Sequence, residues 1–313
     1  MAKAKRIRGI DCKNAAAAGI RLVLQTRFEE MYGFRQVALD WSDPEGVHSM
    51  RVASRRLRSA MRDFMPFLHQ RGLTSVLKQT KSIAAALGEV RDQDVAIIAL
   101  EKIQKQSPDA VSSTLQLLID ERKELRTESR EKLNSVLVHD AMKEAKSEFM
   151  SRVEKATSER KPRGPAGHQV TYARMSATVI LDRLKELEKL SESLYRPFEI
   201  ESLHDMRIAA KRLRYALELF QQCWGRPLQT FAKNAARIQT ALGDVHDCDV
   251  WIENLGKHIN RARKEKQDDQ IVALIWLLSH FVKVRTKHLR KAYDLWREWE
   301  ANDLGGQVRQ TLQ

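Results

Sequence analysis

Two motifs that each occur twice constrain the fold more than any other feature of this sequence. VHSMRVASRRLRSAMRDF at residues 47–64 aligns without a gap on LHDMRIAAKRLRYALELF at residues 203–220. Further along each copy, ALGEVRDQDV at 86–95 aligns on ALGDVHDCDV at 241–250. Because both motifs recur in the same order at nearly the same spacing, they indicate an internal duplication. We therefore expect the 313 residues to form two halves with similar folds.

The composition favours helices in both halves. The chain contains only 13 Gly and 7 Pro, and it is rich in residues with high helix propensity. Apolar residues recur at helical spacing along most of the chain. An all-α fold is predicted, with helices near 15–40, 46–69, 73–87, 92–105, 110–137, 139–157, 170–196, 202–224, 228–242, 248–264 and 270–300.

The two halves are expected to be joined by a short linker. The segment ERKPRGPAG at 159–167 concentrates Pro and Gly near the middle of the chain, which is typical of a connecting segment. The predicted order is a basic N-terminal tail, a first helical half, a linker, a second helical half and a C-terminal tail. Their predicted bounds are 1–14, 15–157, 158–169, 170–300 and 301–313.

The first motif of each half predicts a helix with one basic face and one apolar face. At about 100° per residue, the basic residues of each copy fall within one sector. The first stripe consists of His48, Arg51, Arg55, Arg58 and Arg62, opposite Met50, Ala53, Leu57, Met61, Phe64 and Leu68. The second stripe consists of His204, Arg207, Lys211 and Arg214, opposite Met206, Leu213, Leu217 and Phe220. Glu218 stands where the first copy has Arg62, so the second stripe is shorter.

The charge pattern of these stripes favours an anionic ligand over an ordinary solvated face. An exposed helix usually places acids four residues from its bases, yet none lies between His48 and Arg58. The whole chain has 55 Lys and Arg against 41 Asp and Glu, a net charge of +14. Such a balance favours polyanionic partners. A merely solvent-exposed basic face on a scaffold protein is the plainer alternative.

The helix after each stripe adds further candidate cations. Lys78 and Lys81 in the first half, and Lys233 and Arg237 in the second, have the spacing of one helix face. Lys78 aligns with Lys233, whereas Lys81 and Arg237 do not align with each other. For Lys81 and Arg237, ordinary exposure to solvent explains the spacing equally well.

The second motif of each half is interpreted as structural. Gly88 and Gly243 are predicted to end a helix in the left-handed conformation, and Asp92 and Asp247 to cap the next one. Asp94 and Asp249 would then interact with the positive end of that helix. A hard metal ion held by paired carboxylates is a weaker alternative. His246-x-Cys248 has only chance-level value as a metal motif, and neither residue is assigned a role.

Neither a metal site nor a catalytic site is predicted. The neighbours of His48 and His204 are cations, which favour a neutral imidazole; a bound phosphate would favour protonation instead. We therefore predict that both histidines contact phosphate, in preference to binding a metal ion. The sequence contains no phosphate-binding loop, dinucleotide fingerprint or nucleophile with its base. We expect neither enzymatic activity nor a cofactor.

The remaining features concern the compartment. Cys12, Cys223 and Cys248 lack CxxC spacing and are predicted to be reduced. No apolar run is long enough to cross a bilayer, and the basic N-terminus is not followed by the apolar stretch of a secretory signal. A cytoplasmic protein without membrane insertion is expected. The sequence makes no prediction of its oligomeric state.

The doubled pattern His-x-x-Arg-x-x-x-Arg/Lys-Arg-x-Arg, followed in each half by LGxVxDxDV, resembles the conserved histidine α-helical domain (CHAD) family. The resemblance covers residues 15–300. It implies two helical bundles related by a pseudo-twofold axis, with a shared basic groove or pore that binds inorganic polyphosphate. It also implies association with polyphosphate granules.

The resemblance carries a set of binding positions onto this chain. By the family pattern these are His48, Arg51, Arg55, Arg56, Arg58, Lys78, His204, Arg207, Lys211, Arg212, Arg214 and Lys233. Arg56 and Arg212 point about 80° away from the two stripes. Weaker candidates are Arg21, Arg62 and Arg174.

Non-catalytic binding of polyphosphate is the leading functional hypothesis. Polyphosphate has no bases to be read, so rows of guanidinium and ammonium groups suffice to bind it. A nucleic-acid-binding helical protein is the alternative, because a basic helical surface serves that role too. Against it, only Tyr215 interrupts a stripe, and stacking platforms for bases are not evident.

Overall fold

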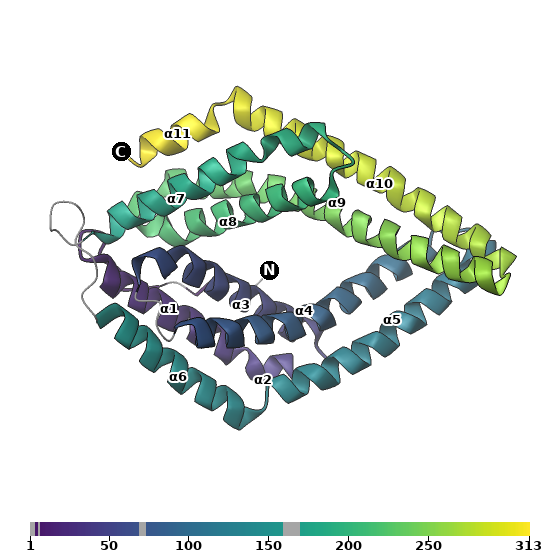
Figure 1. Ribbon diagram of the computed structural model, residues 1–313, viewed down its shortest axis with the longest axis horizontal. Helices are drawn as coiled ribbons and strands as arrows, with labels where there is room; N and C mark the ends of the chain where they lie inside the picture. Colours follow the sequence, from purple (N-terminus) through teal and green to yellow (C-terminus); the bar gives the residue numbers. More distant parts are fainter. Residues whose placement is uncertain (1–3, 6, 69–72, 159–169) are drawn as a thin grey trace. The chain divides into compact units, whose positions relative to one another are not determined.

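The computed structural model describes residues 4–5, 7–68, 73–158 and 170–313, and this part of the chain is all-α as predicted (Figure 1). It contains eleven α-helices and no strand, apart from an isolated antiparallel bridge between Ala15 and Thr171. The α-helices are α1 (Ala16–Gly33), α2 (Arg35–Ala38), α3 (Pro44–Phe64), α4 (Leu73–Gln104), α5 (Asp109–Val136), α6 (His139–Ser158), α7 (Tyr172–Lys189), α8 (Ile200–Trp224), α9 (Arg226–Glu265), α10 (Asp268–Ala301) and α11 (Leu304–Thr311). Two short 3-10 helices, η1 (Met65–Phe67) and η2 (Ser191–Tyr195), follow α3 and α7.

The helices form two compact units whose bounds differ from the two halves defined by sequence. The first unit comprises residues 1–101 and 119–176, and the second comprises residues 102–118 and 177–313. The end of α4, the turn after it and the start of α5 thus belong to the second unit, although the sequence places them in the first half. Long helices explain this difference, because one helix can contribute to two separate cores.

The core of the first unit lies on the apolar face of α3. α1 packs against both α3 and α6, and α2 packs against α3 (Figure 1). Phe28 of α1 stacks on Phe149 of α6, with ring centroids 4.3 Å apart. The predicted apolar face of α3 is buried, at residues Met50, Ala53, Leu57, Met61 and Phe64, and Leu68, which follows η1, is buried as well. Burial of this face leaves the first stripe on the remaining surface of the helix.

The second unit is built around α9. This helix packs along both α8 and α10 (Figure 1). α8 also contacts η2. The predicted apolar face of α8 is buried, at residues Met206, Leu213, Leu217 and Phe220. Between α8 and α9 the chain turns at Gly225, whose φ of 71° lies in the region that favours glycine.

The second motif of each half does not separate two helices, and this prediction is wrong. α4 and α9 run without a break through Gly88 and Gly243, and the only glycines with positive φ in the described part are Gly9 and Gly225. The helices continue because Leu87 and Val90 in α4 are fully buried, so the apolar face stays in register through the glycine. Asp92, Asp94, Asp247 and Asp249 are therefore interior helix residues and not caps.

Ion pairs anchor these long helices to their neighbours. Asp94, which is buried, lies 3.6 Å from a guanidinium nitrogen of Arg126 on α5. Asp249, also buried, accepts a hydrogen bond from Arg285 of α10, and Arg285 in turn donates to the carbonyl oxygen of Pro197 at 2.8 Å. The final Asp of the repeated motif thus joins α4 to α5 and α9 to α10.

Both predicted tails contain packed residues. In the N-terminal segment, Ile7 is buried and the backbone amide of Lys5 donates to Glu30 at 3.0 Å. At the other end, the segment predicted as a tail forms α11, where Val308 is buried and Arg309 pairs with Glu188 of α7. Of the predicted linker 158–169, Ser158 ends α6, and residues 159–169 lie outside the described part of the chain.

The prediction of three reduced cysteines is wrong for two of them. Cys12 and Cys223 are disulfide-bonded, whereas Cys248 is free and buried. Disulfides persist mainly in oxidising compartments, so the cysteines no longer support the expectation of a cytoplasmic protein. Within the described residues, every helix is too short or too polar to cross a membrane.

Candidate functional site

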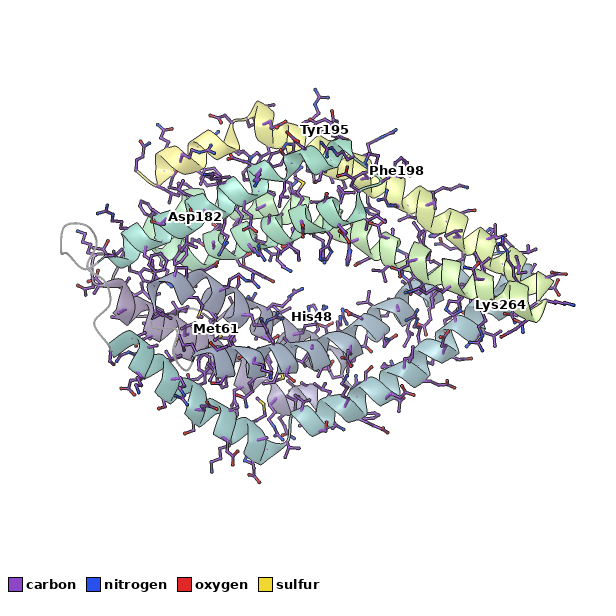
Figure 2. All side chains as sticks on the ribbon, viewed as in Figure 1. His48, Met61, Asp182, Tyr195, Phe198 and Lys264 are labelled. Carbon is purple, nitrogen blue, oxygen red and sulfur yellow. The ribbon has the colours of Figure 1, made fainter. Side chains whose placement is uncertain are left out.

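The first stripe lies on α3, and local signals set the start of this helix. The side chain of Asp43 caps it by accepting a hydrogen bond from the backbone amide of Glu45 at 2.8 Å, and Pro44 occupies the first turn. His48, labelled with Met61 in Figure 2, lies in the next turn. The side chains of the stripe are half-buried, at His48, Arg51, Arg55, Arg58 and Arg62.

Arg51 contacts the second motif of its own half. Its Nη2 atom donates to a carboxylate oxygen of Asp92 on α4 at 3.0 Å. The side chain of Asp92 is 66% exposed, so water weakens this ion pair. Asp92 of α4 thus supplies part of the negative charge that is absent between His48 and Arg58 on α3.

Arg55 and Arg58 lack such a partner within the described part of the chain. The Nε atom of each is buried and makes no hydrogen bond there. Burial also lowers the pKa of Arg58, because desolvation disfavours its charged form. A buried donor without an acceptor costs about 1–3 kcal/mol. An anion at this face would supply the acceptors that these two guanidinium groups need.

Arg56 and Arg212 are engaged in structural ion pairs. Arg56 Nη1 lies 3.4 Å from Glu30 of α1, a buried carboxylate that also pairs with Arg27. In the second unit, Arg212 pairs with Glu186 of α7. These two arginines, which the family pattern places among the binding residues, therefore join α3 to α1 and α8 to α7.

His48 lies in a positive environment. Burial lowers its pKa most, followed by the positive charge of Arg91 on α4, while Glu45 acts in the opposite direction. Arg55 lowers the pKa further. His48 is therefore neutral near pH 7 unless an anion binds beside it.

The second stripe places its histidine against another one. Nδ1 of His204 on α8 lies 3.1 Å from Nδ1 of His246 on α9, and the ring centroids are 4.4 Å apart. Burial, Arg207 and Lys211 lower the pKa of His204, whereas Asp205 raises it. The pKa of His246 is lowered to about 4 by burial first, then by Arg207, His204 and Lys211. Arg207 and Lys211 are thus close to the histidine pair.

The far end of the second stripe is less cationic than that of the first. Arg214 Nε donates to Glu218 at 2.7 Å, and its Nη1 lies 3.4 Å from the side-chain oxygen of Gln239 on α9. Glu218 is the residue that replaces Arg62 of the first stripe. This replacement both removes one cation and neutralises the cation before it.

A basic hollow of about 450 Å³ lies between α9 and α10. Lys233 and Arg237, both predicted site residues, line it together with Lys291 of α10. Arg237 also makes two contacts of 3.0 Å with Glu298, one from each terminal guanidinium nitrogen. The hollow therefore keeps a positive charge even with Arg237 neutralised.

The other predicted residues lie on different surfaces. Lys78 and Lys81 are exposed on α4, and Arg174 is exposed on α7. Arg21 bridges α1 to α6 by donating to the hydroxyls of Thr157 at 2.8 Å and Ser158 at 3.1 Å. Arg21 thus has a structural position, which agrees with its lack of any motif.

Sequence reasoning missed three residues of these surfaces, namely Arg91, His246 and Lys291. The signal for the first two was present, because the second motifs align Arg91 with His246 and so place a basic side chain at one position in both halves. Lys291 lies outside both motifs and had no comparable signal. In the described part of the chain, no three His, Cys, Asp or Glu side chains are grouped as metal ligands.

Comparisons with known proteins agree with this architecture. The structure is similar to "Crystal structure of the CHAD domain from the plant Ricinus communis", with a TM-score of 0.69, 21% identity, and coverage of 91% of this chain and 95% of that chain. It is also similar to "PptA from Streptomyces chartreusis", with a TM-score of 0.67, 12% identity, and coverage of 91% and 100%. At these identities the likeness establishes the fold alone, and no curated protein sequence matches the chain. The CHAD domain profile matches residues 22–256, which include both copies of both motifs, and the chain therefore belongs to the CHAD domain family.

Proposed function

We propose that this protein binds inorganic polyphosphate without catalysing its hydrolysis, using the cations of the two stripes. The CHAD family is associated with polyphosphate, and the charge of this chain fits such a ligand. Within this proposal the halves arose by duplication, both stripes bind one polyanion, and the protein associates with polyphosphate granules. The proposed contacts are His48, Arg51, Arg55, Arg58, Arg62, Lys78, Lys81, His204, Arg207, Lys211, Arg214, Lys233 and Arg237.

The observation that carries this proposal is the state of Arg55 and Arg58. Both belong to one helix face, and each has a buried Nε donor without an acceptor in the described part of the chain. Arg56 and Arg212 share a buried Nε without an acceptor but pair with glutamates through a terminal nitrogen, whereas Arg55 and Arg58 have no ion pair in the described part of the chain. A phosphate group offers several acceptor oxygens that match the planar fork of a guanidinium group. A ligand with many phosphates could engage both arginines along the helix.

The surroundings of the stripes favour polyphosphate over nucleic acid. Single-stranded nucleic acids bind through aromatic platforms as well as cations. Tyr215, the aromatic residue that interrupts the second stripe, is only 7% exposed and has no face available for a base.

Arg56 and Arg212 are assigned a structural role here, since each holds its helix against a glutamate.

A competition experiment tests the proposal. Labelled long-chain polyphosphate is bound at fixed salt and then displaced by unlabelled polyphosphate, RNA or DNA. We expect polyphosphate to compete best per phosphate, and the double variant Arg55→Gln/Arg58→Gln to bind it at least about tenfold more weakly. The matched control is Lys143→Gln/Lys155→Gln on the exposed face of α6, which removes the same charge. Stronger competition by nucleic acid, or equal losses in both variants, contradicts the proposal.

The non-catalytic part of the proposal has its own test. Purified protein is incubated with polyphosphate and with nucleotides, with and without divalent metal ions, and phosphate release is measured. We expect none above the background of the Arg55→Gln/Arg58→Gln variant. Metal-dependent release that copurifies with the protein through several steps contradicts this part while leaving the binding proposal intact.

A further inference from the structure

One position of the repeated second motif differs between the two halves in a way that changes the chemistry of the surface. The alignment pairs Arg91 with His246. In the first unit, Arg91 lies close enough to His48 for its charge to lower the pKa of that histidine. In the second unit, His246 instead contacts His204, Nδ1 to Nδ1, at 3.1 Å. The aligned position thus places a permanent cation beside the stripe histidine in the first unit and a second histidine beside it in the second unit.

The histidine pair can hold one proton between its facing nitrogens. A neutral imidazole has one nitrogen that donates and one that accepts, so one Nδ1–H donates to the other Nδ1. A further proton goes to the outer Nε2 of the ring that donates, which gives one imidazolium and keeps the hydrogen bond between the facing nitrogens. Because burial and the neighbouring cations lower the pKa of both rings, the pair is uncharged near neutral pH in the free protein, with one hydrogen bond joining α8 to α9.

The charges around the pair reinforce this neutral state. From α8, Arg207 and Lys211 act on both histidines, and Asp205 acts on His204 in the opposite direction. From α10, the other helix packed along α9, His288 lies 3.1 Å from Asp244 of α9. Burial first, and then the positive charges of Arg207 and Lys211 together with His204, lower the pKa of His246 to about 4. A phosphate group beside Arg207 and Lys211 would counteract these positive charges.

We propose that His204 and His246 form a proton-coupled phosphate contact in the second unit, whereas Arg91 keeps the corresponding contact of the first unit permanently cationic. This inference rests on the proposed function, because it assumes that the stripes bind phosphate groups. It adds Arg91 and His246 to the binding surface and makes the affinity of the second unit depend on pH.

The direction of the dependence follows from linkage. A bound anion stabilises imidazolium, so the pKa of the pair is higher in the complex than in the free protein. Between these two values, binding takes up a proton, and affinity rises as the pH falls. Above the pKa that the pair has in the complex, the pair is neutral in both the free and the bound protein, and it contributes no pH dependence. The slope for one proton is at most about tenfold in affinity per pH unit.

Titration calorimetry with long-chain polyphosphate at fixed ionic strength tests this proposal. Long chains are used because their few terminal groups, which titrate near pH 6 to 7, then contribute little. Runs at about pH 6 and about pH 8, in buffers with different heats of ionisation, count the protons taken up on binding. For the wild-type protein we expect uptake near pH 6, little near pH 8, and tighter binding at the lower pH.

Substitutions at the two aligned positions separate the roles of the units. His246→Gln should take up fewer protons than the wild type near pH 6 and lose part of the gain in affinity there, while His204 and His48 keep their own share of the uptake. His246→Arg, which copies the first unit, should bind more tightly at pH 8 and take up fewer protons than the wild type near pH 6. Arg91→His should weaken binding at pH 8 and increase the proton uptake.

The control is His280→Gln on α10. Burial and Lys283 lower the pKa of His280, but its ring contacts Trp276 and Phe281 of α10 instead of the stripe. This variant should keep the full proton uptake of the wild type. Circular dichroism checks the fold of each variant, and His246→Arg serves as the second test if His246→Gln unfolds.

The outcomes distinguish this inference from the proposed function. If the wild type fails to bind polyphosphate at both pH values, the proposed function fails and this inference falls with it. If the wild type binds but His246→Gln, or His246→Arg in its place, takes up as many protons as the wild type, only the proton-coupled contact is overturned. An equal loss of uptake in His280→Gln also overturns it, because the effect would then not belong to the α8–α9 pair.

Discussion

A guanidinium nitrogen of Arg51 on α3 lies 3.0 Å from a carboxylate oxygen of Asp92 on α4, and this contact links the two repeated motifs of the first half. It gives the first Asp of LGxVxDxDV a role beside the basic stripe. Asp92 competes with any anion for Arg51, because both offer oxygens to the same donors. The contact is accessible to water, so a polyanion can displace it at small cost.

Removing this competing carboxylate should strengthen ligand binding. We expect Asp92→Asn to bind polyphosphate about two- to fivefold more tightly at fixed salt, since an exposed ion pair contributes at most about 1 kcal/mol. The free energy of unfolding should change by less than about 1 kcal/mol for the same reason. A weaker affinity in this variant would indicate that Asp92 holds Arg51 in its binding position.

The position of the cations should matter more than the total charge. Changing Arg51, Arg55, Arg207 and Lys211 together to Gln should weaken polyphosphate binding by about a hundredfold or more, because each charged hydrogen bond contributes about 1.5–3 kcal/mol before screening. The slope of log affinity against log salt should fall by about two to four.

The matched control for that variant removes four exposed lysines, two from each unit. These are Lys143, Lys155, Lys185 and Lys189. We expect a loss of about threefold or less, which reflects only the reduced net charge. Equal losses in the two quadruple variants, with both shown to be folded by thermal unfolding, would mean that binding follows the +14 charge and has no dedicated surface.

Breaking the Asp249–Arg285 pair should destabilise the second unit. The two side chains are only 7% and 13% exposed, so Asp249→Ala leaves a buried guanidinium group without its anion. We expect a loss of about 3–5 kcal/mol in the free energy of unfolding, measured in urea. Glu253→Gln, which breaks an exposed pair with Lys257, should leave the free energy of unfolding nearly unchanged. Comparable effects of the two substitutions would contradict the anchoring role of Asp249.

A glycine substitution distinguishes a continuous α9 from two helices. A Cβ atom at Gly243 would meet no atom within 4 Å, and its backbone is helical. Gly243→Ala should therefore stabilise the protein by about 0.5–1 kcal/mol in urea unfolding. If Gly243 ended a helix in the left-handed conformation, the same change would destabilise the protein.

Acid should destabilise the second unit through the histidine pair. The pKa of His246 in the fold is about 4, below its ordinary value of 6.5, so the unfolded chain binds a proton first as the pH falls. The contribution of His246 to the free energy of unfolding is fully present above about pH 6.5. It is lost progressively as the pH falls to about 4, below which His246 is protonated in both the folded and the unfolded state. Thermal unfolding at several pH values should show a smaller fall in Tm for His246→Gln than for the wild type. An unchanged fall would mean that other groups cause the acid sensitivity.

The local pattern of the sequence determined the all-α class and the faces of the two stripe helices. The apolar rows of α3 and α8 were assigned correctly because a period of 3.6 residues is visible without any tertiary contact. The same geometry separated Arg56 and Arg212 from the stripes, and both are now found in ion pairs with glutamates of preceding helices. The repeated motifs also identified the family, because residue identities at fixed spacing do not depend on knowing the fold.

Only the tertiary structure decided where helices continue and which side chains meet. Gly88 and Gly243 resemble helix ends when only local propensity is considered. Burial of Leu87 and Val90 in α4, and of Leu242 and Val245 in α9, outweighs the cost of about 1 kcal/mol for a glycine inside a helix. The contacts of Arg51 with Asp92 and of His204 with His246 join residues about forty positions apart. Such contacts depend on how helices pack side by side, which helical periodicity alone does not specify.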